Sequence, residues 1–236
     1  GLVGCNYFDS DGISQRKPNA ENVMAEEGLG RTANDFFWET FHQGEYEQVD
    51  SVIHLLTAAY TEDPNILETV SHLGFAHIWK LAERGRLEEV PPTIIDHASL
   101  NLKYFSESND MNPRDPRMLG FLGTSQMTLG AISDDPKMTR QGYFDGRKSI
   151  RQWRTFNYFT VGYVLSQLPH TDQRFQDGLD WMWETMDICY CEKVDREGFD
   201  LRDYLAKQAE TTDTDLLRAC WNSWIAPHNL EGFYLN

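Results

Sequence analysis

Residues 67–86 read LETVSHLGFAHIWKLAERGR, and this stretch decides how the chain folds. Ile66, directly before it, begins a series that continues through Val70, Leu73, His77 and Leu81 in steps of three and four residues. Steps of that size place side chains on one face of an α-helix. The stretch therefore predicts an amphipathic helix with one buried face.

The same spacing recurs in three later segments: Ile95 to Phe105, Leu119 to Leu129, and Phe175 to Cys189. Residues 156–165, FNYFTVGYVL, are rich in strand-forming residue types, but their neighbours favour a helix. Proline suits the first turn of a helix, and Asp or Asn before it suits the cap. Such breakers separate the segments, at Asp63-Pro64-Asn65, Pro91-Pro92, Asn112-Pro113, Asp115-Pro116, Asp134-Asp135-Pro136 and Pro169. The sequence predicts an all-α fold.

Composition excludes some classes of function. The chain has 236 residues, of which 40% are hydrophobic, and a net charge of −16. An acidic surface repels phosphate backbones, so no nucleic-acid partner is expected. The sequence contains no run of about 18 apolar residues, the length that a helix needs to span a membrane. The four cysteines, Cys5, Cys189, Cys191 and Cys220, lack the spacing of a zinc site.

Residues 44–65, GEYEQVDSVIHLLTAAYTEDPN, resemble the second helix of a tetratricopeptide repeat with its closing turn. Residues 67–86 resemble a first helix, and Leu73-Gly74, Gly123 and Val161-Gly162 match the small-residue position where paired helices approach closely. The glycines lie 49 and 39 residues apart, against about 34 in the family. The resemblance implies stacked antiparallel helix pairs, a divergent α-solenoid over residues 33–193, with a concave surface for a protein partner. A helical bundle without repeats is the alternative.

The first residues carry a second resemblance. Leu2-Val3-Gly4-Cys5 resembles the lipobox of bacterial lipoproteins. It implies a lipid thioether on Cys5 and acyl chains that anchor the protein to a membrane. Asn6, in place of Asp, implies the outer membrane, with the protein facing the periplasm or the cell surface. Residues 1–32 are then a lipidated N-terminus and flexible tether. The alternative is that Cys5 is an ordinary small apolar residue.

A lipidated Cys5 implies an oxidising compartment, where Cys189 or Cys191 could pair with Cys220. Cys189 lies on the apolar stripe with Met186, so we expect the Cys191–Cys220 disulfide, with free thiols as the alternative. It would close a loop of about 30 residues and contribute roughly 3–4 kcal/mol.

The C-terminal residues 194–236 are expected to be irregular, with short helices. We expect the natural chain to continue past Asn236 or a partner to cover this end; folding back onto the last helix pair is the alternative.

No motif for hydrolysis, phosphate binding or metal ligation occurs, and His77 is expected to be a core histidine. We expect no catalytic residue, cofactor or metal. The sequence predicts a lipid-anchored helical scaffold that binds a partner protein on its concave face or C-terminal end. Trp79, Tyr104 and Gln126 are weak candidates for the groove. The rivals are a periplasmic accessory of a transporter that binds a small apolar ligand and, less favoured, an enzyme or metal protein.

Overall fold

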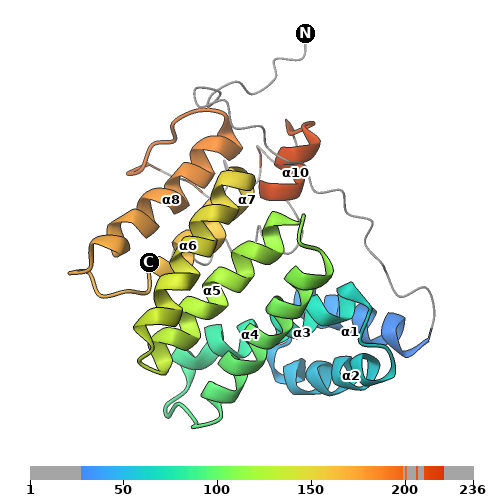
Figure 1. Cartoon of the computed structure of the whole chain (residues 1–236). Helices are drawn as coiled ribbons and strands as arrows, with labels where there is room; N and C mark the ends of the chain where they lie inside the picture. The colour runs from blue at the N-terminus through green and yellow to red at the C-terminus, as the bar shows by residue number, and fades with distance from the viewer. Residues whose placement is uncertain (1–27, 199, 201–205, 207–209, 221–236) are drawn as a thin grey trace. The chain divides into compact units, whose positions relative to one another are not determined.

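The computed structural model describes residues 28–198, 200, 206 and 210–220. These residues form an all-α protein, and no strand occurs among them (Figure 1). They divide into two compact units, with the boundary between Gly146 and Arg147. We call residues 28–146 the N-terminal unit and residues 147–220 the C-terminal unit.

The N-terminal unit is built from consecutive helices that pack against one another. Its core lies among the first four helices and is formed by Ala33, Phe37, Val52, Leu56, Ala59, Val70, Leu73, Ala76 and Tyr104. The helices are α1 (Leu29–Gln43), α2 (Val49–Glu62), α3 (Leu67–Ala82), α4 (Ile94–Met111), α5 (Pro116–Ile132) and α6 (Pro136–Gln152), whose last turns belong to the C-terminal unit.

The central helix α3 confirms the pattern in residues 67–86. Val70 and Leu73 are fully buried, and His77 and Leu81 are nearly so. Gly74 lies on the face toward α4, where an added Cβ would come within 2.8 Å of the Phe105 ring. The stripe therefore buries the helix against both of its neighbours in sequence.

Glycines let α5 and α6 approach closely. A Cβ on Gly123 would lie 2.7 Å from the amide nitrogen of Gly146, and one on Gly130 would lie 2.7 Å from the amide nitrogen of Thr139. Gly123, which comes earlier in α5, faces Gly146, whereas Gly130 faces Thr139, which comes earlier in α6. The two helices are therefore antiparallel. Backbone contacts this short leave no room for any side chain.

The C-terminal unit contains a second glycine contact, between α7 (Arg154–Leu165) and α8 (Gln173–Tyr190). A Cβ on Gly162 would lie 2.7 Å from the carbonyl oxygen of Gly178. The short helix α10 (Thr214–Cys220) packs against α7 and α8. The segment FNYFTVGYVL lies within α7, so the expectation of a helix there is confirmed.

The predicted caps are present at Asp115-Pro116 and Asp135-Pro136, whereas Asp63, before Pro64, ends α2 and caps no helix start. The Asp115 carboxylate accepts a hydrogen bond from the backbone amide of Arg117, with Pro116 in the first turn of α5. The Asp135 carboxylate likewise accepts the amides of Lys137 and Met138 at the start of α6. Each cap satisfies amide groups that have no partner inside the helix.

The structure bears on the predicted boundaries in three places. Helix α1 begins at Leu29, inside the range 1–32 that the sequence assigns to a tether. The boundary between units falls inside α6, within the range 33–193 that the sequence treats as one helical region. In the range 194–236, α10 is a short helix as expected, and residues 221–236 lie outside the described residues.

Candidate functional site

Trp79 was predicted to line a groove, but the structure places it in the core. Its side chain is 8% exposed and lies in the second half of α3. The indole contacts Phe41 edge to face at 5.0 Å and Tyr46 at 6.0 Å between ring centroids. This aromatic packing fixes the end of α1 on α3.

Tyr104 is also buried, at 5% exposed, and belongs to the core of the N-terminal unit. Its ring stacks on His77 and meets the Tyr60 ring edge to face. Lys103 lies at the surface above both tyrosines, with its ammonium 4.2 Å from the Tyr104 centroid and 4.5 Å from that of Tyr60. Burial raises the pKa of Tyr104, so its hydroxyl stays protonated at neutral pH.

Lys103 is held by its neighbours. It donates a hydrogen bond to the Tyr60 hydroxyl at 3.1 Å, pairs with Glu107 at 3.2 Å, and the Tyr60 hydroxyl donates to Glu107. Burial by itself lowers the pKa of Lys103, but the bonds to Tyr60 and Glu107 more than offset it and raise that pKa. The ammonium is therefore charged and fixed on the surface of α2 and α4.

Gln126 lies on α5 beside the contact with α6, with its Cβ close to Gly142. It is partly exposed, but its Oε1 atom is buried and accepts no hydrogen bond. The three candidates thus lie on three different helices and pack against different neighbours. Trp79 and Tyr104 stabilise the fold from inside, and neither side chain presents a large surface to a partner.

Among the large apolar side chains that face solvent in the described residues, the sequence reasoning named only Ile95, which it placed on an apolar stripe. Phe144, on α6 in the N-terminal unit, is 59% exposed and is the most exposed large apolar side chain in the described part of the chain. Val90 and Leu87, in the connection before α4, and Ile95 in its first turn are exposed as well. Only the structure finds these residues, because exposure depends on how neighbouring helices pack.

Two buried histidines on α3 face opposite neighbours. The side-chain amide of Asn34 donates to the Gly30 carbonyl and to Thr69 Oγ1, so its oxygen accepts from His72 Nδ1 at 2.6 Å. Burial lowers the pKa of His72 to about 3. His77 instead faces α4, with its Nδ1 atom 2.9 Å from Nδ1 of His97. The expectation of a core histidine with a satisfied ring nitrogen is confirmed for His77.

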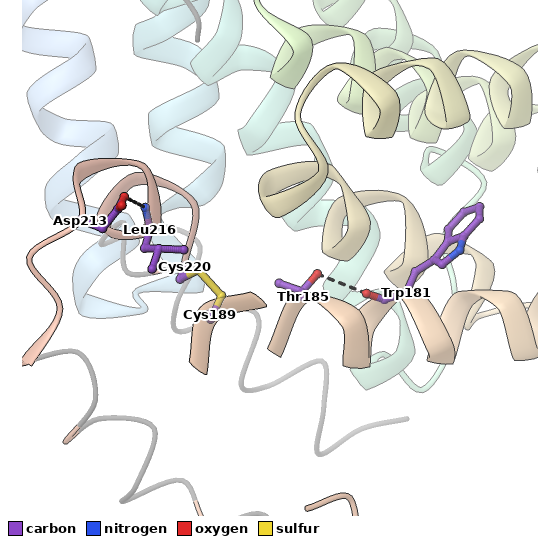
Figure 2. The surroundings of a disulfide bond; sticks show 6 residues. All are labelled: Trp181, Thr185, Cys189, Asp213, Leu216 and Cys220. Carbon is purple, nitrogen blue, oxygen red and sulfur yellow. Dashed lines mark hydrogen bonds between the residues drawn. A yellow bond between two sulfur atoms is a disulfide. The ribbon is translucent and has the colours of Figure 1, made fainter. Parts of the chain in front are cut away.

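A disulfide joins the end of α8 to the end of α10, and its pairing differs from the prediction. The bond links Cys189 to Cys220, with 5.8 Å between their Cα atoms (Figure 2). We expected Cys191 as the partner because Cys189 lies on the apolar stripe. That argument was wrong because α10 packs on this stripe, and it brings the buried Cys220 onto the buried Cys189.

Cys191 lies one step beyond α8, in a left-handed backbone conformation with φ of 58°. It is also disulfide-bonded, so its sulfur is not available to Cys220. The one further cysteine of the sequence, Cys5, was predicted to carry the lipid and lies outside the described residues.

The turn after α8 is held by an ion pair. The Asp187 carboxylate, almost fully buried, accepts two hydrogen bonds from the Arg196 guanidinium and one from the Val194 amide. The guanidinium also lies 4.7 Å above the Trp183 ring. Because the guanidinium and the Val194 amide both bind the Asp187 carboxylate, they hold the residues after α8 against the end of the helix.

Two further findings apply to the residues just described. Among them, no three His, Cys, Asp or Glu side chains gather in a way that could hold a metal ion. In the same residues, no helix combines the length and hydropathy needed to cross a membrane.

Comparison with protein-family models, with curated proteins and with solved structures gives no match.

Proposed function

We propose that the protein is a helical scaffold that binds a partner protein in an oxidising compartment at a bacterial membrane surface. The observation that carries the proposal is the glycine-mediated packing of consecutive helices. Gly74, Gly123 and Gly162 each lie where one helix meets the next one along the chain. Repeat proteins stack such pairs and use the extended surface to bind partners. Tetratricopeptide-like repeats are the arrangement that we propose for this chain.

The exposed apolar side chains suggest where the partner binds. Aromatic side chains contribute strongly to interfaces because they bury a large area with little loss of conformational freedom. Phe144 is 59% exposed, whereas Phe37 and Phe105 are buried. We therefore place the contact on α6 in the N-terminal unit. The net charge of −16 favours a partner with a basic surface.

The Cys189–Cys220 disulfide supports the proposal of an oxidising compartment. Disulfides persist in oxidising compartments such as the periplasm and are rare in the cytosol of most organisms. The Cys189–Cys220 bond is buried at both sulfur-bearing residues, and Cys191 is bonded too. Such bonds fit a protein that works outside the cytoplasm.

The binding experiment uses the full chain as bait on extracts of detergent-solubilised membranes at low and high salt. We expect one partner to be recovered in proportion to the bait, with recovery that falls as salt rises. Phe144→Ser should reduce recovery by about tenfold or more, as for an interface anchor. Leu217→Ser, at another exposed position, is the matched control and should leave recovery unchanged.

Equal recovery by the wild type and Phe144→Ser would contradict the placement on α6. If the wild type retains no partner in an amount proportional to the bait, the scaffold function is contradicted. Circular dichroism of each variant checks that the substituted chains remain folded, which we expect because both positions are exposed.

The lipid anchor at Cys5 stays a prediction, and a disulfide at the same cysteine is the alternative. A cysteine sulfur forms either a thioether to lipid or a disulfide, and the bond at Cys191 requires a second sulfur. Mass spectrometry of unreduced proteolytic peptides from bacterial membranes distinguishes the two. A diacylglycerol-modified Cys5 peptide would support the anchor. A peptide pair joined through Cys5 and Cys191 would contradict it and leave the scaffold proposal standing.

A further inference from the structure

His77 and His97 face each other across the contact between α3 and α4. Their Nδ1 atoms lie 2.9 Å apart, within hydrogen-bond distance. His77 is 2% exposed, and its ring stacks on Tyr104 with 8° between the two planes. His97, in the first turn of α4, is partly exposed. The pair thus runs from the core of the N-terminal unit to its surface.

This geometry limits how many protons the pair can carry. In the neutral pair, one ring donates from Nδ1 and the other accepts at Nδ1. One added proton goes to the free Nε2 of the donor ring and preserves the bond. A second added proton must go to the acceptor Nδ1, which places two N–H groups head to head. The contact therefore cannot persist when both rings are protonated.

The charged groups around the pair oppose protonation of the inner ring. Burial, together with the charges of His97 and Lys80, lowers the pKa of His77 to about 3. Burial and Lys80 also lower the pKa of His97, where the carboxylates of Asp50 and Asp96 act in the opposite direction. Lys80 itself pairs with Asp50 on α2 at 3.1 Å. Added protons therefore reach His97 before His77.

We propose that the His77–His97 contact is an acid-sensitive device that keeps α3 and α4 together at neutral pH and lets them separate on acidification. The separated state exposes His77 to solvent, where its ring binds a proton freely, while the closed state excludes that proton. The inference concerns the chain alone and does not depend on the proposed scaffold function.

The expected effect follows from proton linkage. An exposed histidine takes up its proton near pH 6.5, and the closed His77 does so only near pH 3. Lowering the pH from 7 to 5 therefore raises the equilibrium constant for opening by about 25-fold.

Hydrogen exchange of the full chain, followed by mass spectrometry at pH 7 and pH 5, tests the proposal. After correction for the intrinsic pH dependence of exchange, protection of α4 peptides (94–111) should fall by about 25-fold at pH 5. Peptides from α8 (173–190) serve as the internal reference and should keep their protection. A loss confined to α4 and its neighbours identifies local opening rather than global unfolding.

Two variants remove the proton site at the inner ring. His77→Gln retains a polar group, and His77→Phe retains the stacking on Tyr104; in whichever of them folds, the loss at α4 should shrink to less than about fivefold. His54→Gln, at an exposed position on α2, is the control and should behave like the wild type. A wild-type loss below about threefold would overturn the proposal, as would an undiminished loss in the His77 variants.

Discussion

The two units of this protein are held together by different chemistry. The N-terminal unit has a core of aromatic and aliphatic side chains in which two neutral histidines, His72 and His77, are buried. The described part of the C-terminal unit has a covalent bond, Cys189–Cys220, and an ion pair between the buried Asp187 and the partly exposed Arg196 at the end of one helix. The difference teaches that the first unit should respond to acid and the second to reduction.

Loss of the disulfide should have the largest effect. The bond spans 31 residues, so its removal restores chain entropy worth about 4 kcal/mol to the unfolded state. Paired Cys189→Ala and Cys220→Ala substitutions should destabilise the C-terminal unit by about that amount. Urea unfolding followed by pulsed hydrogen exchange reports each unit separately. An equal loss in the N-terminal unit would remove the contrast between the units.

Substitution of a packing glycine comes second. Gly162→Ala places a methyl group 2.7 Å from the Gly178 carbonyl oxygen, so α7 and α8 must move apart. We expect a cost of about 2–3 kcal/mol in the C-terminal unit, measured by urea unfolding. Gly142→Ala is the matched change in the N-terminal unit, where the Cβ would meet the Gly123 carbonyl oxygen at 2.5 Å. No cost at either position would show that these helices do not approach closely.

The third effect in size should be a loss of stability in the N-terminal unit on acidification. The pKa of His72 is lowered to about 3 in the folded state, so on acidification the unfolded state binds the proton first. Stability is unaffected above about pH 7 and falls as the pH drops below about 6.5, by about 2 kcal/mol for His72 at pH 5. Urea unfolding of the N-terminal unit between pH 7 and pH 5 measures it. The same slope in His72→Gln would contradict the assignment.

A surface ion pair should have the smallest effect. Lys80 pairs with Asp50, whose side chain is 67% exposed, so solvent screens the interaction. Asp50→Asn should cost the N-terminal unit about 0.5 kcal/mol in urea unfolding at low salt. At about 1 M salt the wild type and the variant should become indistinguishable. A cost above about 2 kcal/mol would mean that the pair is not a simple surface contact.

Local sequence predicted the helices well because their signals are local. The caps Asp115-Pro116 and Asp135-Pro136 act within a few residues of the chain, and both appear in the structure as predicted. The stripe on α3 is buried as expected. Ile95, at the start of the next stripe, lies in the first turn of α4 and is 42% exposed. The spacing of apolar residues predicts a helix face, but it does not predict how far a neighbouring helix covers that face.

The candidate site was less predictable because it depends on which surfaces meet. An amphipathic pattern tells that Trp79 and Tyr104 lie on helices, but not that Phe41, Tyr46 and His77 cover them. The same limit explains the cysteine error: the stripe on α8 marked Cys189 as buried, and only the packing of α10 shows that this buried cysteine is the one bonded to Cys220.

By itself, the sequence determined the all-α fold, the starts of α5 and α6 and the glycines at which helices meet, because hydrophobic spacing, caps and small residues act over one or two helical turns. Tertiary structure alone decided the partner of Cys220, the pairing of His77 with His97 and the exposure of Phe144. These features join or separate residues on different helices. Their physical cause is therefore the packing of one surface on another, which no local spacing specifies.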